Sequence, residues 1–146
     1  MKSPLLLFVL FFAGFVHSAQ AQMERTMYQV FEVDSVQTVQ FDITGEYDVL
    51  PWAGNSILVE TNVQIWDASR EILSDLIKKG RYDLTTDSSA VPNPTDIRIF
   101  TKYINRKSIK RIDGQKCLEI AVTKIFVPDT FLISEDKKRL TRKPKQ

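Results

Sequence analysis

Two residues, His17 and Cys117, decide most of the nucleophilic and metal chemistry open to this chain, because it has one histidine and one cysteine. Ser-His-Asp and Cys-His sites need an imidazole base. Most zinc sites need histidine or several cysteines. A single cysteine has no partner for an intramolecular disulfide, so we expect Cys117 to be buried, with pairing between two chains as the alternative.

The histidine lies in a segment that reads as an export signal. Lys2 is followed by an apolar run over residues 5–16 and by Ala19-Gln20-Ala21, which has small residues at the cleavage positions. We expect residues 1–21 to be a signal peptide; an uncleaved anchor is the alternative. A chain starting at Gln22 contains no histidine, so we expect no enzyme activity, no cofactor and no metal site.

Carboxylates are the remaining groups that could do chemistry. Asp42, Glu46 and Asp48 lie close together around a turn, but they lack the spacing of a calcium loop. A hydrolase that uses only carboxylates stays open as a minor alternative, since glycoside hydrolysis needs just two of them in a cleft.

A candidate ligand surface combines two tryptophans with a basic stretch. Its residues are Trp52, Trp66, Arg106, Lys107, Lys110 and Arg111. Tryptophan rings can line a sugar-binding surface, but at strand ends they are more often half-buried. These residues carry our second hypothesis, a domain that binds polysaccharide or an anionic ligand.

The charge is divided unevenly along a chain whose net charge is only +2. Residues 22–97 hold 13 acidic and 5 basic residues, whereas residues 98–146 hold 5 acidic and 14 basic ones. Cross-strand pairing between the two halves is one explanation. A basic face that meets an anionic surface is the other. We expect no nucleic-acid partner, and we expect residues 137–146 to be a solvated basic tail.

Alternating apolar residues predict strands over most of the chain. Val39, Phe41 and Ile43 share one face, and residues 57–66 alternate over a longer strand. Further strands are expected at residues 47–50, 81–86, 96–103, 117–127 and 130–134. In the strand at 117–127, Leu118 and Ile120 share one face, and Glu119 lies on the other.

One helix interrupts the strands. Asp67 or Ser69 can cap its start, and Gly80 can end it. Ile72, Leu73, Leu76 and Ile77 form a single stripe, which must pack on a sheet. The composition and these patterns predict a mainly β protein: a single antiparallel β domain, residues 22–136, with one helix packed on a sheet.

Two stretches resemble a known family. Residues 39–60 (VQFDITGEYDVLPWAGNSILVE) and 118–131, which include IFVPDTF, are similar to bacterial exported adhesin-like domains of unknown function. The resemblance implies an exported solenoid or stacked-sheet surface protein and supplies no catalytic residues. We therefore expect a non-enzymatic structural or adhesin-like module in the periplasm or at the cell surface. Its expected partner is an envelope or cell-surface component, and its oligomeric state stays open.

Overall fold

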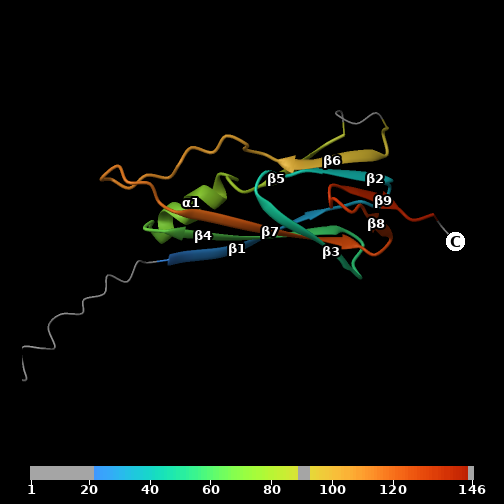
Figure 1. The fold of residues 1–146 in the computed structure, drawn as a ribbon, viewed down its shortest axis with the longest axis horizontal. Helices are drawn as coiled ribbons and strands as arrows, with labels where there is room; N and C mark the ends of the chain where they lie inside the picture. The colour runs from blue at the N-terminus through green and yellow to red at the C-terminus, as the bar shows by residue number, and fades with distance from the viewer. Residues whose placement is uncertain (1–21, 89–92, 145–146) are drawn as a thin grey trace, which may run out of the picture.

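The computed structural model describes residues 22–88 and 93–144, which form two β-sheets and one helix (Figure 1). Sheet A has the strand order β1-β4-β7-β3, with bounds Gln22–Phe31, Ile57–Trp66, Glu119–Pro128 and Glu46–Trp52. Sheet B has the order β5-β6-β2-β9-β8, with bounds Leu84–Asp87, Asp96–Thr101, Thr38–Asp42, Arg139–Arg142 and Phe131–Ile133. The predicted mainly β class with one helix is confirmed.

Both sheets are mixed. β3 pairs in parallel with β7, and β2 pairs in parallel with β6, while the remaining neighbours are antiparallel. Parallel neighbours need long connections rather than hairpins. Alternation within one strand reports its two faces and carries no information about its partner's direction, so the sequence pattern did not reveal these crossovers.

The inner face of sheet A carries two cores. Ile57 and Val59 of β4 lie in the first core, where sheet B packs over sheet A. Val63 and Ile65 of the same strand lie in the second core, beneath the helix. Between them Thr61 shares a buried hydrogen bond with Thr123 of β7, with 3.2 Å between their hydroxyl oxygens. A polar pair thus separates the two cores, and its groups satisfy each other.

The helix α1 (Arg70–Lys78) begins and ends as its sequence predicts. The Ser69 hydroxyl accepts a hydrogen bond from the Ile72 N–H at 3.3 Å, which satisfies a donor of the first turn. Gly80 follows at φ +71°, a conformation that favours glycine. Leu73 is fully buried, whereas Ile72, from the predicted apolar stripe, is 41% exposed.

The prediction that residues 137–146 form a solvated basic tail is wrong for residues 139–142. Arg139–Arg142 forms β9, which lies between β2 and β8 inside sheet B. Leu140 is fully buried, and Arg142 donates hydrogen bonds to the carbonyl oxygens of Val33 and Val36. One apolar residue among five basic ones gave too weak an alternation to predict a strand, so the domain extends past residue 136.

The predicted signal peptide, residues 1–21, lies outside the described residues. Within residues 22–88 and 93–144, no helix has the length and apolar character to cross a bilayer.

The position of Leu140 gives a stability prediction. We expect Leu140→Ala to lower the free energy of unfolding by about 2–5 kcal/mol, because it opens a cavity in the first core. Leu132 on the neighbouring strand β8 is 55% exposed, so Leu132→Ala is the matched control and should change stability by about 0.5 kcal/mol or less. Urea denaturation followed by tryptophan fluorescence measures both. Equal, small effects would show that β9 does not contribute to the core.

Candidate functional site

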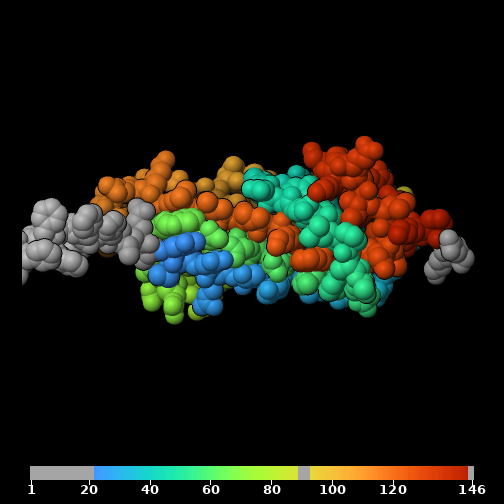
Figure 2. Space-filling model, turned by 60° about the horizontal axis from the view of Figure 1, so that its bottom comes forward, coloured from blue at the N-terminus to red at the C-terminus, as the bar shows by residue number. Residues whose placement is uncertain are grey.

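The outer face of sheet A is open to solvent. The even-numbered residues of β1 and β4 point away from both cores, and none of these side chains is buried. In Figure 2 the four strands, coloured blue, green, orange and teal, lie side by side and are visible over most of their length. Sheet B and α1 both cover the opposite face, so this one is bare in the described chain.

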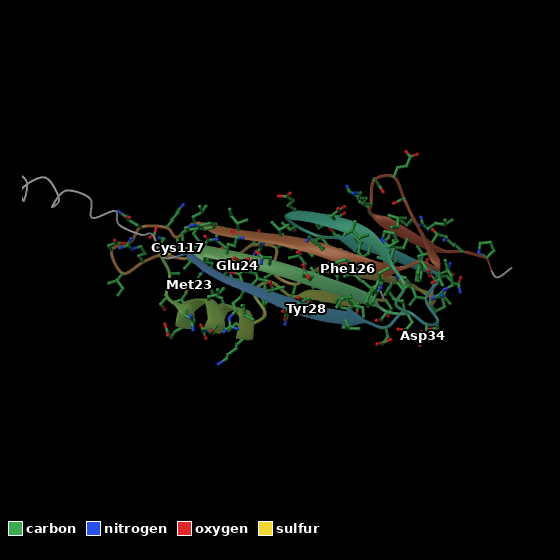
Figure 3. The ribbon with its side chains drawn as sticks, turned by 90° about the horizontal axis from the view of Figure 1, so that it is seen from below. Met23, Glu24, Tyr28, Asp34, Cys117 and Phe126 are labelled. Atoms are coloured by element: carbon green, nitrogen blue, oxygen red, sulfur yellow. The ribbon has the colours of Figure 1, made fainter. Side chains whose placement is uncertain are left out.

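A row of apolar side chains crosses this outer face. Register pairs Val30 with Leu58, Leu58 with Phe126, and Phe126 with Leu50. Val30 is 57% exposed, and Tyr28, two residues before it on β1, is 62% exposed. Figure 3 shows the face from below, with Tyr28 on β1 and Phe126 on β7. Side chains of this kind bury apolar area when a partner covers them.

The same face is acidic. Its carboxylates are Glu24, Glu46, Asp48 and Glu60, and its strands supply one cation, Lys124. Lys124 lies 3.9 Å from Glu60, and Lys137 reaches Asp48 from the turn before β9. Glu24 accepts a hydrogen bond of 2.7 Å from the Asn62 side chain. The carboxylates therefore outnumber the cations that reach them.

Trp52, a predicted ligand residue, folds back onto its own turn. Its indole N–H donates to the Ser56 carbonyl oxygen at 3.0 Å, and its ring centroid lies 6.4 Å from that of Phe126. The ring passes so close to Gly54 that a Cβ there would approach it to 2.2 Å. Trp52 thus closes the β3–β4 turn and adds a half-buried ring to the end of the apolar row.

Trp66, the second predicted ring, lies at the far end of the same face. Its backbone N–H donates to the Leu118 carbonyl oxygen at 3.0 Å. Trp52 lies beside the start of β4 and Trp66 at its end, so the two are about 30 Å apart at 3.3 Å per residue. The structure therefore does not bring the two tryptophans into one site.

Arg106 lies apart from Lys110 and Arg111, in a cluster around an ion pair. Its guanidinium lies 5.5 Å from the centre of the Tyr82 ring. Beside it Arg81 donates to both oxygens of Glu119, each at 2.8 Å, and also to the Lys107 carbonyl oxygen at 2.7 Å. Both side chains of the ion pair are mostly buried. Arg81 follows α1 in the chain, so these hydrogen bonds link the end of the helix to β7 and to the loop that contains Lys107.

The ion pair keeps Glu119 charged. Burial raises the pKa of Glu119, but the hydrogen bonds from Arg81 and the Arg81 charge, with the Tyr82 hydroxyl nearby, outweigh it, so the pKa lies below its ordinary value of 4.5. Burial, followed by the Glu119 carboxylate, raises the pKa of Tyr82. An ionised Glu119 beside a neutral Tyr82 is suited to holding the loop and poorly suited to donating a proton.

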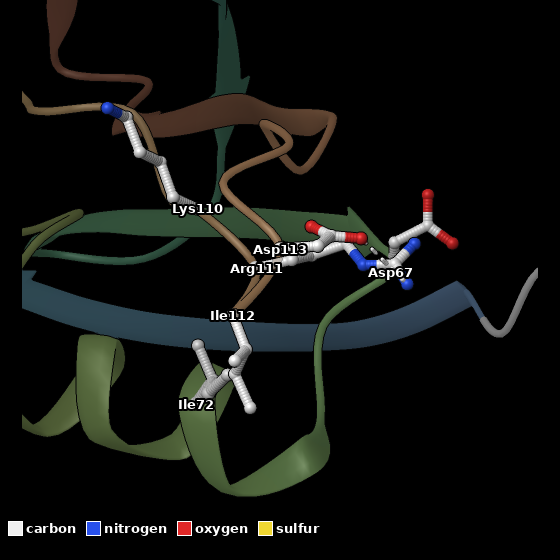
Figure 4. Close-up of a pocket in the computed structure, with 6 residues that line it drawn as sticks. All are labelled: Asp67, Ile72, Lys110, Arg111, Ile112 and Asp113. Carbon is white, nitrogen blue, oxygen red and sulfur yellow. Dashed lines mark ion pairs between the residues drawn. The ribbon is translucent and has the colours of Figure 1, made fainter.

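Lys107, Lys110 and Arg111 lie on the loop between β6 and β7, and all three are exposed. Lys110 and Arg111 line a pocket of about 470 Å³ between this loop and α1, together with Asp67, Ile72, Ile112 and Asp113 (Figure 4). Arg111 pairs with Asp113 at 3.4 Å. The four predicted basic residues therefore form two groups along one loop. Arg106 and Lys107 lie beside Arg81, and Lys110 and Arg111 line the pocket.

Cys117 is buried, as predicted, and its thiol donates to the Asp67 carbonyl oxygen at 3.5 Å. Two of the three carboxylates around the turn, Asp42 and Asp48, lie on different sheets. Asp42 lies 3.6 Å from Arg98 on sheet B, whereas Asp48 binds Lys137 at the edge of sheet A. The turn that brings these carboxylates together in sequence separates them in space.

Comparison with protein-family models, curated proteins and solved structures finds no match. The resemblance to exported adhesin-like domains therefore stays a prediction.

The sequence shows the apolar residues of the outer face, but it does not show that they face solvent. Leu118 is 57% and Ile120 is 42% exposed, while Thr123 of the same strand is buried. The sequence correctly predicts the alternation in β7, yet its apolar side near residue 120 faces solvent. Only the partner strands decide which side of β7 is covered.

The Arg81–Glu119 pair gives a second stability prediction. Glu119→Gln keeps the shape of the side chain but leaves the Arg81 guanidinium without its counter-ion. We expect the free energy of unfolding at pH 7 to fall by about 1–3 kcal/mol, measured by urea denaturation. Glu60→Gln is the control, because its 3.9 Å pair with Lys124 involves a side chain that is 54% exposed.

The effect should depend on pH with a defined sign. A folded-state pKa of Glu119 below 4.5 means that the ion pair contributes fully above pH 4.5 and is lost as the pH falls through the folded-state value. The stability difference between the wild-type protein and Glu119→Gln should therefore shrink below pH 4.5. A difference that grows on acidification would contradict the assignment of a lowered pKa.

Proposed function

We propose that this protein is an exported, non-enzymatic binding module of the cell envelope or surface that holds a partner on the outer face of sheet A. The observation that carries the proposal is the apolar row Val30, Leu58, Phe126 and Leu50, which crosses a sheet face that no described segment covers. Val30 is exposed and the other three side chains are partly exposed, and a contiguous apolar patch of this kind on a protein surface often marks an interaction site.

The charges indicate what kind of partner this is. Carboxylates outnumber cations on the outer face, so two copies of the same face would repel each other. A protein surface that combines apolar side chains with lysines or arginines complements both features. This favours a second kind of protein, structural or adhesive, over symmetric self-association.

Export is supported by the pattern of residues 1–21, a short basic start followed by an apolar run and small residues. A non-enzymatic role is supported by the buried thiol of Cys117 and by Glu119, which Arg81 holds in its ionised form. A general acid needs a carboxyl group whose pKa is shifted upward. The separation of Trp52 from Trp66 disfavours a single sugar-binding site that uses both rings.

The docking proposal is tested by solid-phase binding of the protein, purified from cells that express the full chain, to immobilised envelope fractions of the producing cells. We expect saturable binding that the double variant Tyr28→Thr, Val30→Thr weakens at least ten-fold, because it removes exposed apolar area while keeping residues that suit a strand. The control is Leu132→Thr, an equally exposed position on sheet B. Absence of saturable binding, or equal weakening by the control, would contradict the proposal.

Export is tested separately by fractionation and N-terminal sequencing. We expect the protein outside the cytoplasm with Gln22 as its first residue. Recovery from the cytosol with Met1 intact would contradict export while leaving the docking face untouched.

A further inference from the structure

We propose that residues 109–117, which we call the basic hairpin, dock on a bilayer surface that contains anionic lipids. The basic hairpin belongs to the loop between β6 and β7 and is separate from the apolar row of sheet A. The inference therefore goes beyond the proposed function and is tested independently of it.

The basic hairpin has a defined structure. The Arg111 N–H donates to the Gln115 carbonyl oxygen at 2.8 Å, and the Cys117 N–H donates to that of Ile109 at 2.9 Å. Ile109 and Cys117 both pack into the second core beneath α1. Because its base is anchored in this way, the hairpin holds its tip in a fixed position on the molecule.

Two lysines face each other across the basic hairpin. Lys110 and Lys116 are direct antiparallel partners, and no ion pair to either is found among the described residues. Like charges directly opposite each other in such a pair are unfavourable. An anionic group bound between the two side chains relieves this repulsion, so the pairing indicates an anionic ligand.

The tip of the basic hairpin carries one apolar side chain, Ile112. Ile112 has a relative exposure of 110%, the highest of the exposed large hydrophobic residues, and it lies beside Ile72 of α1, which is 41% exposed (Figure 4). A soluble polyanion such as a sulfated glycan gains little from two exposed isoleucines. An interfacial lipid layer accommodates apolar side chains and basic ones together.

The balance of charge around the basic hairpin favours anionic lipid over neutral lipid. Residues 109–117 contain three cations, Lys110, Arg111 and Lys116, and a single carboxylate, Asp113. Asp113 pairs with Arg111, and Asp67 also lines the pocket beside the tip. With both carboxylates counted, cations at the basic hairpin still outnumber them by three to two, which suits the surface potential of an anionic leaflet.

The other basic region of the described chain is less free to bind a surface. Lys137 is engaged with Asp48, and Arg142 is engaged with two backbone carbonyls and the Phe131 ring. The remaining exposed lysines there, Lys138 and Lys143, supply a matched control because they carry the same charge as Lys110 and Lys116.

The test is flotation of the protein, purified from cells that express the full chain, with vesicles of phosphatidylcholine alone or with about 30% phosphatidylglycerol. We expect binding only to the mixed vesicles, weakened as salt shortens the Debye length. Each lysine removed near the surface should weaken binding about five-fold, so Lys110→Gln with Lys116→Gln should weaken it roughly 25-fold. Ile112→Ser should weaken it about ten-fold through lost apolar burial.

Controls separate this outcome from others. Lys138→Gln with Lys143→Gln should change binding less than about three-fold, and urea midpoints should show that all variants fold. No binding to mixed vesicles, or an equal loss with the control pair, would overturn the proposal. So would tight binding to heparin that Ile112→Ser leaves unchanged, which would assign the basic hairpin to a soluble polyanion. Loss of envelope binding through Tyr28 and Val30 has no bearing on these results.

Discussion

The fold depends on how the long inner face of sheet A is covered, because sheet B and α1 are each too short to cover it alone. β1, β4 and β7 are each ten residues long, whereas the strands of sheet B have three to six. Sheet B therefore covers only the half with Ile57 and Val59, and α1 with the base of the basic hairpin covers the half with Val63 and Ile65. Arg81 fixes the second cover by binding Glu119 and the Lys107 carbonyl.

This arrangement places every described covering element on the inner side, so the outer side of sheet A is bare. The loop from β6 to β7 that supplies part of the second cover also carries six basic residues and one carboxylate, Asp113. Acidic groups gather on the outer face and basic groups on the loop. The uneven charge along the sequence therefore becomes two surfaces of opposite sign, in place of complete cross-strand neutralisation.

The sequence predicts those features that depend on local pattern. The strands around Phe41 and Ile57, the Ser69 cap and the burial of Cys117 follow from alternation, capping and composition. Features set by distant partners could not be predicted: the parallel pairing of β3 with β7, the insertion of β9, and the solvent-facing side of β7 at Ile120. Grouping Arg106 with Lys110 fails for the same reason, since Tyr82 and α1 hold the two at separate places.

Hydroxyl-radical footprinting in living cells tests most directly whether the outer face of sheet A is a docking surface. The labelling of Tyr28 and Phe126 is compared between the purified protein and intact producing cells, with Leu132 as the reference. We expect Tyr28 to be labelled readily and the partly buried Phe126 less strongly in the purified protein, and both to be protected several-fold in cells, while Leu132 is labelled equally in both. Equal labelling of Tyr28 in the two samples would show that the face stays bare in the cell and would contradict the account.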